Sequence, residues 1–500
     1  MEVVEVPTRK LGGERRDFSV ELWSGSDLGK KTKYKDKKKV DVDPDHEYGY
    51  WHLLPDLLLE KVFQYLSLSQ RYCASMVCRR WYEAFSYPRV WYTFVLHDEL
   101  LTKRRFNICS GWQKLLDHIR TSYFVTNKGK NIRTLIFPRM NNLFNLYEFL
   151  NISYYLNQRY LGLLDNIHTL RFSFACQVME RQEEHVFGTG GQILAMLKKV
   201  MGELKNLRTL ELCDLLLDGC EGLPLLDDVC ITCCETLRTL TLINLTKLAY
   251  TLLHPGAFVN LQTLIISPQN IGDDLIELLG TSQLRNLFIL QNKYTEHGKS
   301  LNYKTWKVCR RNNPRLRVHL CTEGNVKRDI IWQERAPVKS VVYDSPYAKI
   351  TPPVVLTIIE LYKSDLEVFA HKQLPRFYMP RSFHDRIDST LLLLVRQCPY
   401  IHTLVIREKI STATVLLLAY TAKNLHYFYV RRNAIILKAD WPYNPDWTPE
   451  FYLWLRKNAR SYEALEAEVS QILGYRWQAL TDKQFKMIKL DLEKPYFMYS

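Results

Sequence analysis

The sequence predicts an α/β protein: three short N-terminal helices, then a long solenoid of repeated strand-and-helix units, then a C-terminal cap. Three observations support this. Helically spaced apolar residues begin near residue 49, segments of the form L-x-x-L-x-L recur from about residue 130, and a stretch rich in Trp, Tyr and Pro follows the last of them. A chain of 500 residues is too long for one ordinary domain unless it is a repeat array, whose core grows with each repeat.

The composition is that of a folded protein, with 47% hydrophobic and 24% charged residues. The first twenty residues contain no apolar core of a secretory signal. The longest aliphatic run, residues 391–395, is far shorter than the ~20 residues that cross a bilayer. We therefore expect a cytoplasmic and/or nuclear protein without a membrane partner.

Residues 1–48 are predicted to be a flexible polar tail. Residues 1–49 hold 11 Lys/Arg and 11 Asp/Glu, so the lysine-rich run at 30–39 leaves this segment neutral overall. Such a run is typical of a solvated linker, with nuclear import or an anionic surface as the alternatives. The net charge of +15 therefore lies in the folded body, which favours an acidic or phosphorylated partner.

Residues 49–93 are predicted to form three short helices. Pro55 stands just inside the first, where its missing N–H costs nothing, and Trp81 and Phe85 belong to the third. So small a domain would gain stability by pressing apolar surface onto a partner. A helical linker is expected over 94–128. The apolar residues at helical spacing in the first helix are Leu58, Leu59, Val62, Phe63 and Leu66.

Residues 129–435 repeat one pattern, which predicts the solenoid. Weaker copies begin at Leu316 and Leu366, and the spacing, roughly 30 residues, lies at the long edge of leucine-rich repeats. Helix-like runs separate the copies, so a parallel sheet should line the concave side with helices outside. Residues 436–500 are expected to cap the last repeat, a ligand-binding role being the alternative. The clear copies are NIRTLIF, NIHTLRF, NLRTLEL, TLRTLTL, NLQTLII, QLRNLFI, PVKSVVY, YIHTLVI and NLHYFYV.

The sequence contains no pattern that supports catalysis: phosphate loop, GxGxxG, HExxH and GxSxG motifs are all missing. Cys230 and Cys233 form a CxxC beside Cys234, but no second ligand pair at zinc spacing follows. We interpret these thiols as packing residues of a helix and expect no metal, no cofactor and no catalytic residue.

Two columns of the repeat predict binding surfaces. The fifth position should face the concave side, and its later half is apolar, which favours protein binding unless the C-terminal tail covers it. The second position is mostly basic, which suits an acidic or phosphorylated segment, a solvated edge being the alternative. Nucleic acid is disfavoured because aromatic residues do not accompany the basic column. The substrate-binding candidates are Arg208, Arg238, Arg285, Phe288, Val342, Val405 and Tyr429.

Residues 54–91, "LPDLLLEKVFQYLSLSQRYCASMVCRRWYEAFSYPRVW", resemble an F-box. The resemblance lies in the initial Leu-Pro, the apolar helix ending in Tyr-Leu, the Leu-Ser loop, the Val-Cys-Arg-Arg-Trp core and the terminal Trp after a proline-containing turn. With the repeats, the chain is similar to F-box proteins of the leucine-rich-repeat type. The resemblance implies contacts with a Skp-type adaptor at Leu54, Pro55, Leu58, Leu59, Val62, Phe63, Leu66, Val77, Cys78 and Trp81.

The resemblance also implies a function. F-box proteins join a Skp-type adaptor and, through it, the cullin and RING subunits of an SCF ubiquitin ligase, to which they bring the substrate. We therefore expect a non-catalytic substrate-recognition subunit. The alternatives are an F-box scaffold with a non-degradative role and a basic solenoid that binds RNA or anionic lipid.

Overall fold

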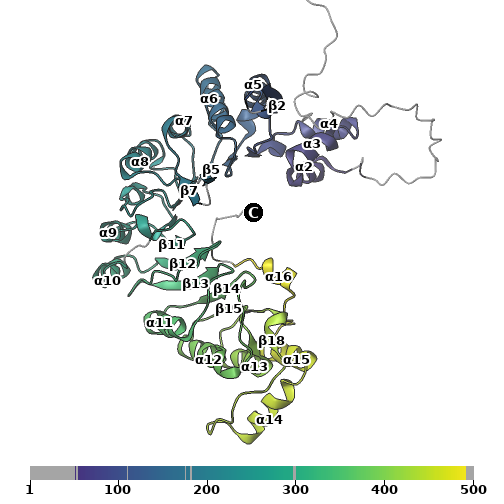
Figure 1. The fold of residues 1–500 in the computed structure, drawn as a ribbon, viewed down its shortest axis with the longest axis vertical. Helices are drawn as coiled ribbons and strands as arrows, with labels where there is room; N and C mark the ends of the chain where they lie inside the picture. The colour runs from purple at the N-terminus through teal and green to yellow at the C-terminus, as the bar shows by residue number, and fades with distance from the viewer. Residues whose placement is uncertain are drawn as a thin grey trace, which may run out of the picture. The chain divides into compact units, whose positions relative to one another are not determined.

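The structure, a computed structural model, describes residues 51, 54–109, 111–160, 162–174, 176–180, 183–296, 300–490 and 492. The predicted tail at 1–48 lies outside these residues. The chain divides into two compact units, which are described separately (Figure 1). Unit 1 comprises Met1–Ile167 and Gly191–Glu203, and unit 2 comprises His168–Gly190 and Leu204–Ser500.

Unit 1 begins with the three predicted helices. The first follows Pro55, carries Asp56 in its first turn and packs against the third. Ser67 and Gln70 form a capping box that starts the second helix, because each side chain accepts from the other residue's backbone N–H. A short 3-10 turn then buries Trp91. These elements are α2 (Asp56–Tyr65), α3 (Leu68–Ser75), α4 (Arg79–Phe85) and η2 (Pro88–Trp91).

The rest of unit 1 corrects one prediction. Among its described residues, the expected helical linker at 94–128 contains a β-hairpin and one helix. The two strands of the hairpin pair antiparallel from Thr102 with Leu116 to Asn107 with Gly111, and Gly111 supplies the positive φ, +70°, at the turn. Strand β1 pairs in parallel with β4. These elements are β1 (Thr93–Val95), β2 (Thr102–Asn107), β3 (Gly111–Leu116), α5 (His118–Lys128), η3 (Gly129–Asn131), β4 (Thr134–Phe137), α6 (Leu143–Arg159) and α7 (Gly191–Gly202).

Unit 2 is built on a parallel sheet whose strands follow one another in chain order. The strong and weak repeat copies of this unit all form strands of the sheet, which confirms the predicted fold class. The strands are β5 (Thr169–Ser173), β8 (Thr209–Cys213), β9 (Thr239–Ile243), β10 (Thr263–Ile266), β11 (Asn286–Gln291), β12 (Arg317–Glu323), β13 (Val338–Asp344), β14 (Val368–His371), β15 (Thr403–Ile406) and β17 (Tyr427–Val430).

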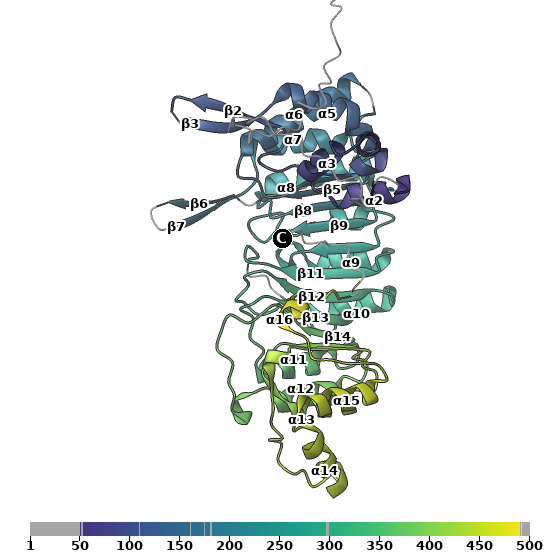
Figure 2. The same cartoon turned by 90° about the vertical axis from the view of Figure 1, so that its right-hand side faces the viewer.

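Helices cover one face of this sheet, and the strands line the other face, as the two views of unit 2 show (Figures 1 and 2). The cause is the repeat itself, because alternate strand residues such as Leu210 and Leu212 point toward the helices and are fully buried. The covering helices are α8 (Gly219–Cys233), α9 (Asp273–Thr281), α10 (Tyr303–Asn312), α11 (Pro352–Tyr362), α12 (Asp388–Gln397) and α13 (Thr412–Thr421).

Polar side chains tie the loops that follow successive strands. Asp214 and Asn244 both have positive φ, at 57° and 46°, a conformation that Asp and Asn tolerate better than most residues. The Asn244 amide donates to Asp214 at 2.7 Å and to Asn292 at 2.6 Å. This network holds neighbouring repeats in register where the hydrogen bonds of the sheet end.

After the last strand of the sheet, two helices, α14 (Pro449–Asn458) and α15 (Tyr462–Leu473), pack against α13. The buried guanidinium of Arg386 donates to Asp388, the first residue of α12, at 2.8 Å and to Asp440 at 2.7 Å, and so ties the segment that leads to α14 to the helices of the solenoid. Unit 2 is completed by β6 (Cys176–Glu180), β7 (Glu183–Phe187), η4 (His254–Ala257), η5 (Pro268–Asn270), η6 (Phe383–Asp385), β16 (Ile410–Ser411), η7 (Arg432–Ala434), β18 (Ile435–Ile436) and α16 (Asp482–Lys486).

Candidate protein-binding surfaces

The three N-terminal helices have a small core, and two of the predicted adaptor contacts belong to it. Leu59 and Phe63 are 1% and 0% exposed, and the Phe63 ring meets Trp81 edge-on with 5.8 Å between ring centroids. Both side chains point from α2 into the domain, so their expected role as direct contacts is corrected to core packing. The sequence predicted them as contacts because helical spacing is the same for apolar residues that face the core and for those that face a partner.

Other apolar side chains of this domain face outward. Leu58 and Val77 are 49% and 66% exposed, as a contact role requires. Sequence reasoning missed Leu57, Tyr65 and Met76, which are 68%, 89% and 59% exposed. Tyr65 lies seven residues after Leu58, so both lie on one stripe of α2. The domain thus presents apolar groups on α2 and in the loop between α3 and α4.

Arg71 holds these helices together, a role that the sequence did not predict. Its buried guanidinium donates to the backbone carbonyls of Phe63 (2.8 Å), Leu66 (2.9 Å) and Val90 (2.6 Å). The carbonyls of Phe63 and Leu66 lie at the C-terminal end of α2, where helix carbonyls lack regular partners; that of Phe63 also accepts from the Leu66 N–H at 3.2 Å. Burial lowers the pKa of Arg71, yet the carbonyls replace the lost water. A single basic residue in "SQRYC" gives no sequence signal of such a role.

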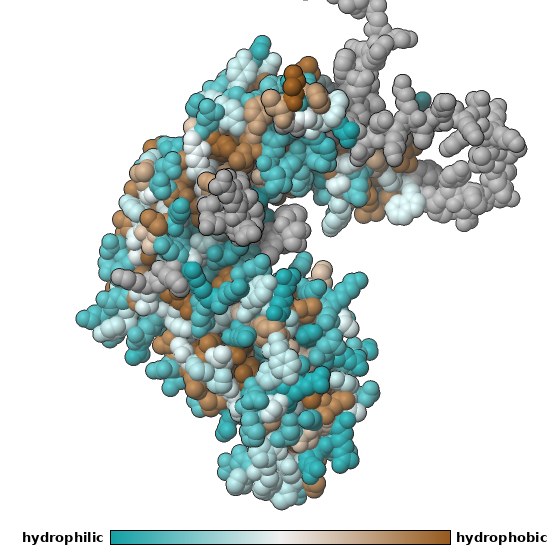
Figure 3. Space-filling view, viewed as in Figure 1, coloured by the Kyte–Doolittle hydropathy of each residue, from teal (hydrophilic) through white to brown (hydrophobic). Residues whose placement is uncertain are grey.

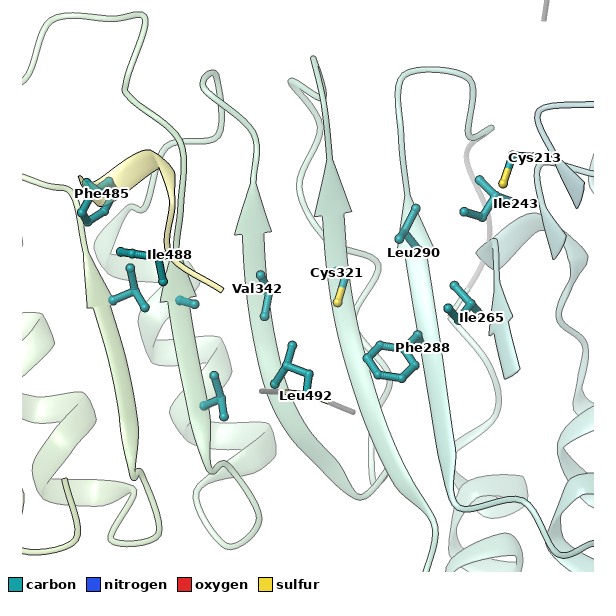
Figure 4. Packing of buried hydrophobic residues seen from close by; sticks show 13 residues of the cluster. Cys213, Ile243, Ile265, Phe288, Leu290, Cys321, Val342, Phe485, Ile488 and Leu492 are labelled. Carbon is teal, nitrogen blue, oxygen red and sulfur yellow. The ribbon is translucent and has the colours of Figure 1, made fainter. Parts of the chain in front are cut away.

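In unit 2 the strand face opposite the helices is not open where the sequence predicted a binding stripe. Phe288, Val342 and Val405 are buried, and Tyr429 is half-buried. The prediction that this column is exposed is therefore wrong for the first three residues, and coverage by the C-terminal tail is what the structure shows. Phe485, Ile488 and Leu492 pack onto the same apolar cluster (Figure 4).

A row of arginines lies at the N-terminal ends of three strands in unit 2. Arg208, Arg238 and Arg285 each precede the first residue of β8, β9 or β11, and the strand pairing aligns them, with Gln262 between the last two. All three are exposed. Their side chains make no ion pair with any residue in the part of the chain that the structure describes.

Farther along the same edge the basic residues are neutralised. Lys339 and Arg317 lie 3.0 and 3.2 Å from Glu367, and Arg310 makes two contacts of 2.8 Å with Asp365. The free positive charge of this edge is therefore concentrated at β8–β11. A space-filling view shows hydrophobic groups scattered among hydrophilic ones over the face of unit 2 that is turned to the viewer (Figure 3).

The cysteine cluster has the geometry of packing residues. Cys233 and Cys234 donate to the carbonyls of Leu204 (3.4 Å) and Ala257 (3.1 Å), so their thiols point to different partners. Burial raises the pKa of Cys230 and of Cys233 to about 11. Within the described ranges no group of three or more His, Cys, Asp or Glu side chains is placed to hold a metal, and no helix is long and apolar enough to cross a bilayer.

Comparison with protein families identifies the N-terminal helices. The F-box-like family model matches residues 51–97, the stretch that holds α2, α3, α4 and the buried Trp91. Residues 51–97 are an F-box-like domain. The parallel sheet with helices on one face has the architecture of a leucine-rich-repeat solenoid, so the chain carries both an F-box-like domain and a solenoid of this kind.

The F-box-like domain places the remaining predicted contacts at its surface or rim. Pro55 is exposed, while Leu54, Val62, Leu66, Cys78 and Trp81 are half-buried. Arg80 lies 2.9 Å from Asp56 and so ties α4 to the start of α2.

The solved structures that match this chain include a leucine-rich-repeat protein of Leptospira interrogans, with 12% sequence identity and a TM-score of 0.27. The alignment covers 63% of this chain and 63% of that protein, so the chain spans less than two thirds of its length. A search of curated proteins gives no match.

Proposed function

We propose that this chain is the substrate-recognition subunit of an SCF-type ubiquitin ligase. The observation that carries the proposal is the exposed apolar surface of the F-box-like domain, at Leu57, Leu58, Tyr65, Met76 and Val77. Burying one large aliphatic side chain contributes about 1.5–3 kcal/mol. A Skp-type adaptor that covers this surface would therefore bind with a substantial favourable free energy.

The mechanism requires no catalytic group in this chain. The adaptor joins the F-box-like domain to a cullin and a RING subunit, and the solenoid holds a protein substrate. Because both are held in one assembly, the effective concentration of substrate lysines near the ubiquitin-charged partner rises. The catalytic chemistry is left to the other subunits.

The arginine row supports a substrate with an acidic or phosphorylated segment. Arg208, Arg238 and Arg285 have no ion-pair partner among the described residues, so their guanidinium groups are available for charge-assisted hydrogen bonds to carboxylates or phosphates. Neighbouring strands lie about 4.8 Å apart, so Arg208 and Arg238 can contact adjacent acidic groups of an extended segment.

Co-precipitation tests the ligase assignment. The wild-type chain is expected to bring down a Skp-type adaptor and a cullin, and the Leu54→Ala/Pro55→Ala variant should bring down less of both. If the wild-type chain recovers neither protein, the proposal is wrong. Ubiquitination and turnover of the proteins that co-precipitate would then separate a ligase subunit from a scaffold.

A further inference from the structure

The segment that covers the strand face is attached firmly at one end only. We call residues 480–490 and 492 the C-terminal strap. At its start, Leu480 forms a parallel bridge with Arg431: its N–H donates to Val430 at 2.9 Å and its carbonyl accepts from Arg432 at 2.8 Å. The Arg431 guanidinium then contacts both carboxylate oxygens of Asp482, at 2.7 and 3.2 Å.

The far end of the strap is held by apolar packing. After Phe485 the backbone hydrogen bonds stay within the strap, from Met487 to Gln484 and from Ile488 to Phe485. Lys489, Leu490 and Leu492 make no hydrogen bond to any residue in the described portion of unit 2. Ile488 and Leu492 nevertheless insert between strand residues that include Val342 and Phe288 (Figure 4). This end can therefore leave the sheet without breaking a backbone ladder.

The floor beneath the strap carries a polar atom that an apolar cover cannot satisfy. His319 stacks on Phe288 with 4.3 Å between ring centroids, and its Nδ1 lies 2.7 Å from the Ser340 hydroxyl. Its Nε2 is buried and has no hydrogen-bond partner among the described residues. Burying such a group without a hydrogen bond is unfavourable. A ligand that offers a hydrogen bond at this position would hold an advantage over the strap.

We propose that the strand face between β11 and β17 is a binding groove for a short protein segment, and that the C-terminal strap is the chain's own occupant of it. The segment would carry three apolar residues spaced like Phe485, Ile488 and Leu492, with a hydrogen-bonding side chain opposite His319. It would displace the strap from Ile488 onward while the anchor at Arg431 and Asp482 stays in place.

The strap should weaken the binding of a partner segment. The strap is part of the same chain and so acts at the high effective concentration of a tethered ligand. A partner segment therefore meets a groove that is open for only a fraction of the time, and its apparent affinity falls by that fraction. This inference rests on the proposed function in one respect, since it places capture of the substrate in this groove.

The experiment uses the strap itself as the probe. A fluorescent peptide of residues 480–500 is titrated into the full chain, into a chain ending at residue 479, and into an Ile488→Asp/Leu492→Asp variant of the full chain. The peptide should bind both altered chains at least tenfold more tightly than the wild-type chain. A peptide carrying the same two Asp substitutions should not bind. No adaptor is present, so the result is independent of the ligase assignment.

Two results would overturn the proposal. One is a folded truncated chain that does not bind the peptide, or binds it no better than the full chain does. The other is loss of the fold in the truncated chain and in the Ile488→Asp/Leu492→Asp variant alike, because the strap would then be an integral part of the core. Circular dichroism and thermal unfolding show whether each chain is folded, so that loss of the fold is distinguished from loss of binding. A Lys483→Gln/Lys489→Gln variant, altered only at exposed residues of the strap, should behave as wild type.

Discussion

The imidazole of His319 lies nearly parallel to the ring of Phe288, 16° from coplanar with centroids 4.3 Å apart, on the floor of the groove that the strap closes. Sequence pattern alone would assign this position to an ordinary strand residue. In the structure it places a titratable group beneath an apolar cover. Burial, with a smaller contribution from Arg317, lowers the pKa of His319 to about 3.

Acid should open or destabilise unit 2 through this residue. His319 is neutral when buried, whereas an exposed histidine has a pKa near 6.5. The stability it contributes is therefore complete above about pH 6.5 and is lost as pH falls toward its folded pKa. At pH 5 the loss is about 2 kcal/mol. Thermal unfolding of the wild-type chain between pH 7.5 and 4.5 should show this decline.

The matched variant for that measurement is His319→Phe, which keeps a ring against Phe288 and removes the titration. The difference between the two melting curves isolates His319, because buried His371, which lies 2.8 Å from Glu408, is present in both chains. The difference should change with pH in the stated direction. Parallel pH profiles would contradict the role given to His319.

Arg71 should be essential to the F-box-like domain. Replacing it with Met removes the charged donor that the carbonyls of Phe63, Leu66 and Val90 share, at a cost of about 3 kcal/mol. Thermal or denaturant unfolding measures the change. Arg79→Met is the control, since Arg79 is exposed on α4 and should change stability by less than about 0.5 kcal/mol. Equal effects of the two substitutions would contradict the structure.

Substitutions of core residues and of contact residues of α2 should differ in their effect on stability, measured by the same unfolding assay. Phe63→Ala removes a fully buried ring and should cost about 3–5 kcal/mol. Leu58→Ala changes a half-exposed side chain of the same helix and should cost much less. If the order of the two effects is reversed, the assignment of Phe63 to the core is wrong.

The arginine row should bind acidic peptides. A labelled oligoglutamate peptide is expected to bind the wild-type chain and to lose at least about tenfold in affinity when Arg208, Arg238 and Arg285 are all changed to Ala, with weaker binding at higher salt. Arg310→Ala/Arg317→Ala is the control, because those side chains already pair with Asp365 and Glu367. A triple variant that binds as tightly as wild type would exclude the row as the site.

The strands of the solenoid were predictable because their period of two is a local property. Leu210 and Leu212 alternate with exposed or concave-facing residues in the sequence itself, and the structure keeps them in place. The hairpin at Thr102–Leu116 was not recognised, since its exposed strands bury too few residues to show a clear pattern.

The sequence could not predict that the groove is covered, for a different reason. Whether Phe288 and Val342 are open depends on the return of Ile488 and Leu492 from the far end of the chain, and no local spacing records such a contact. The same limit applies to Leu58 and Leu59, which are adjacent and chemically identical but face opposite environments.

The most direct test of the central claim is the affinity of the purified chain for a Skp-type adaptor, measured by titration calorimetry. The wild-type chain should bind, and Leu58→Asp/Val77→Asp should weaken binding at least about 30-fold, as loss of central interface contacts does. Leu453→Asp, on an equally exposed leucine of α14, should bind as wild type does. No binding by the wild-type chain, or equal affinity for all three chains, would contradict the account.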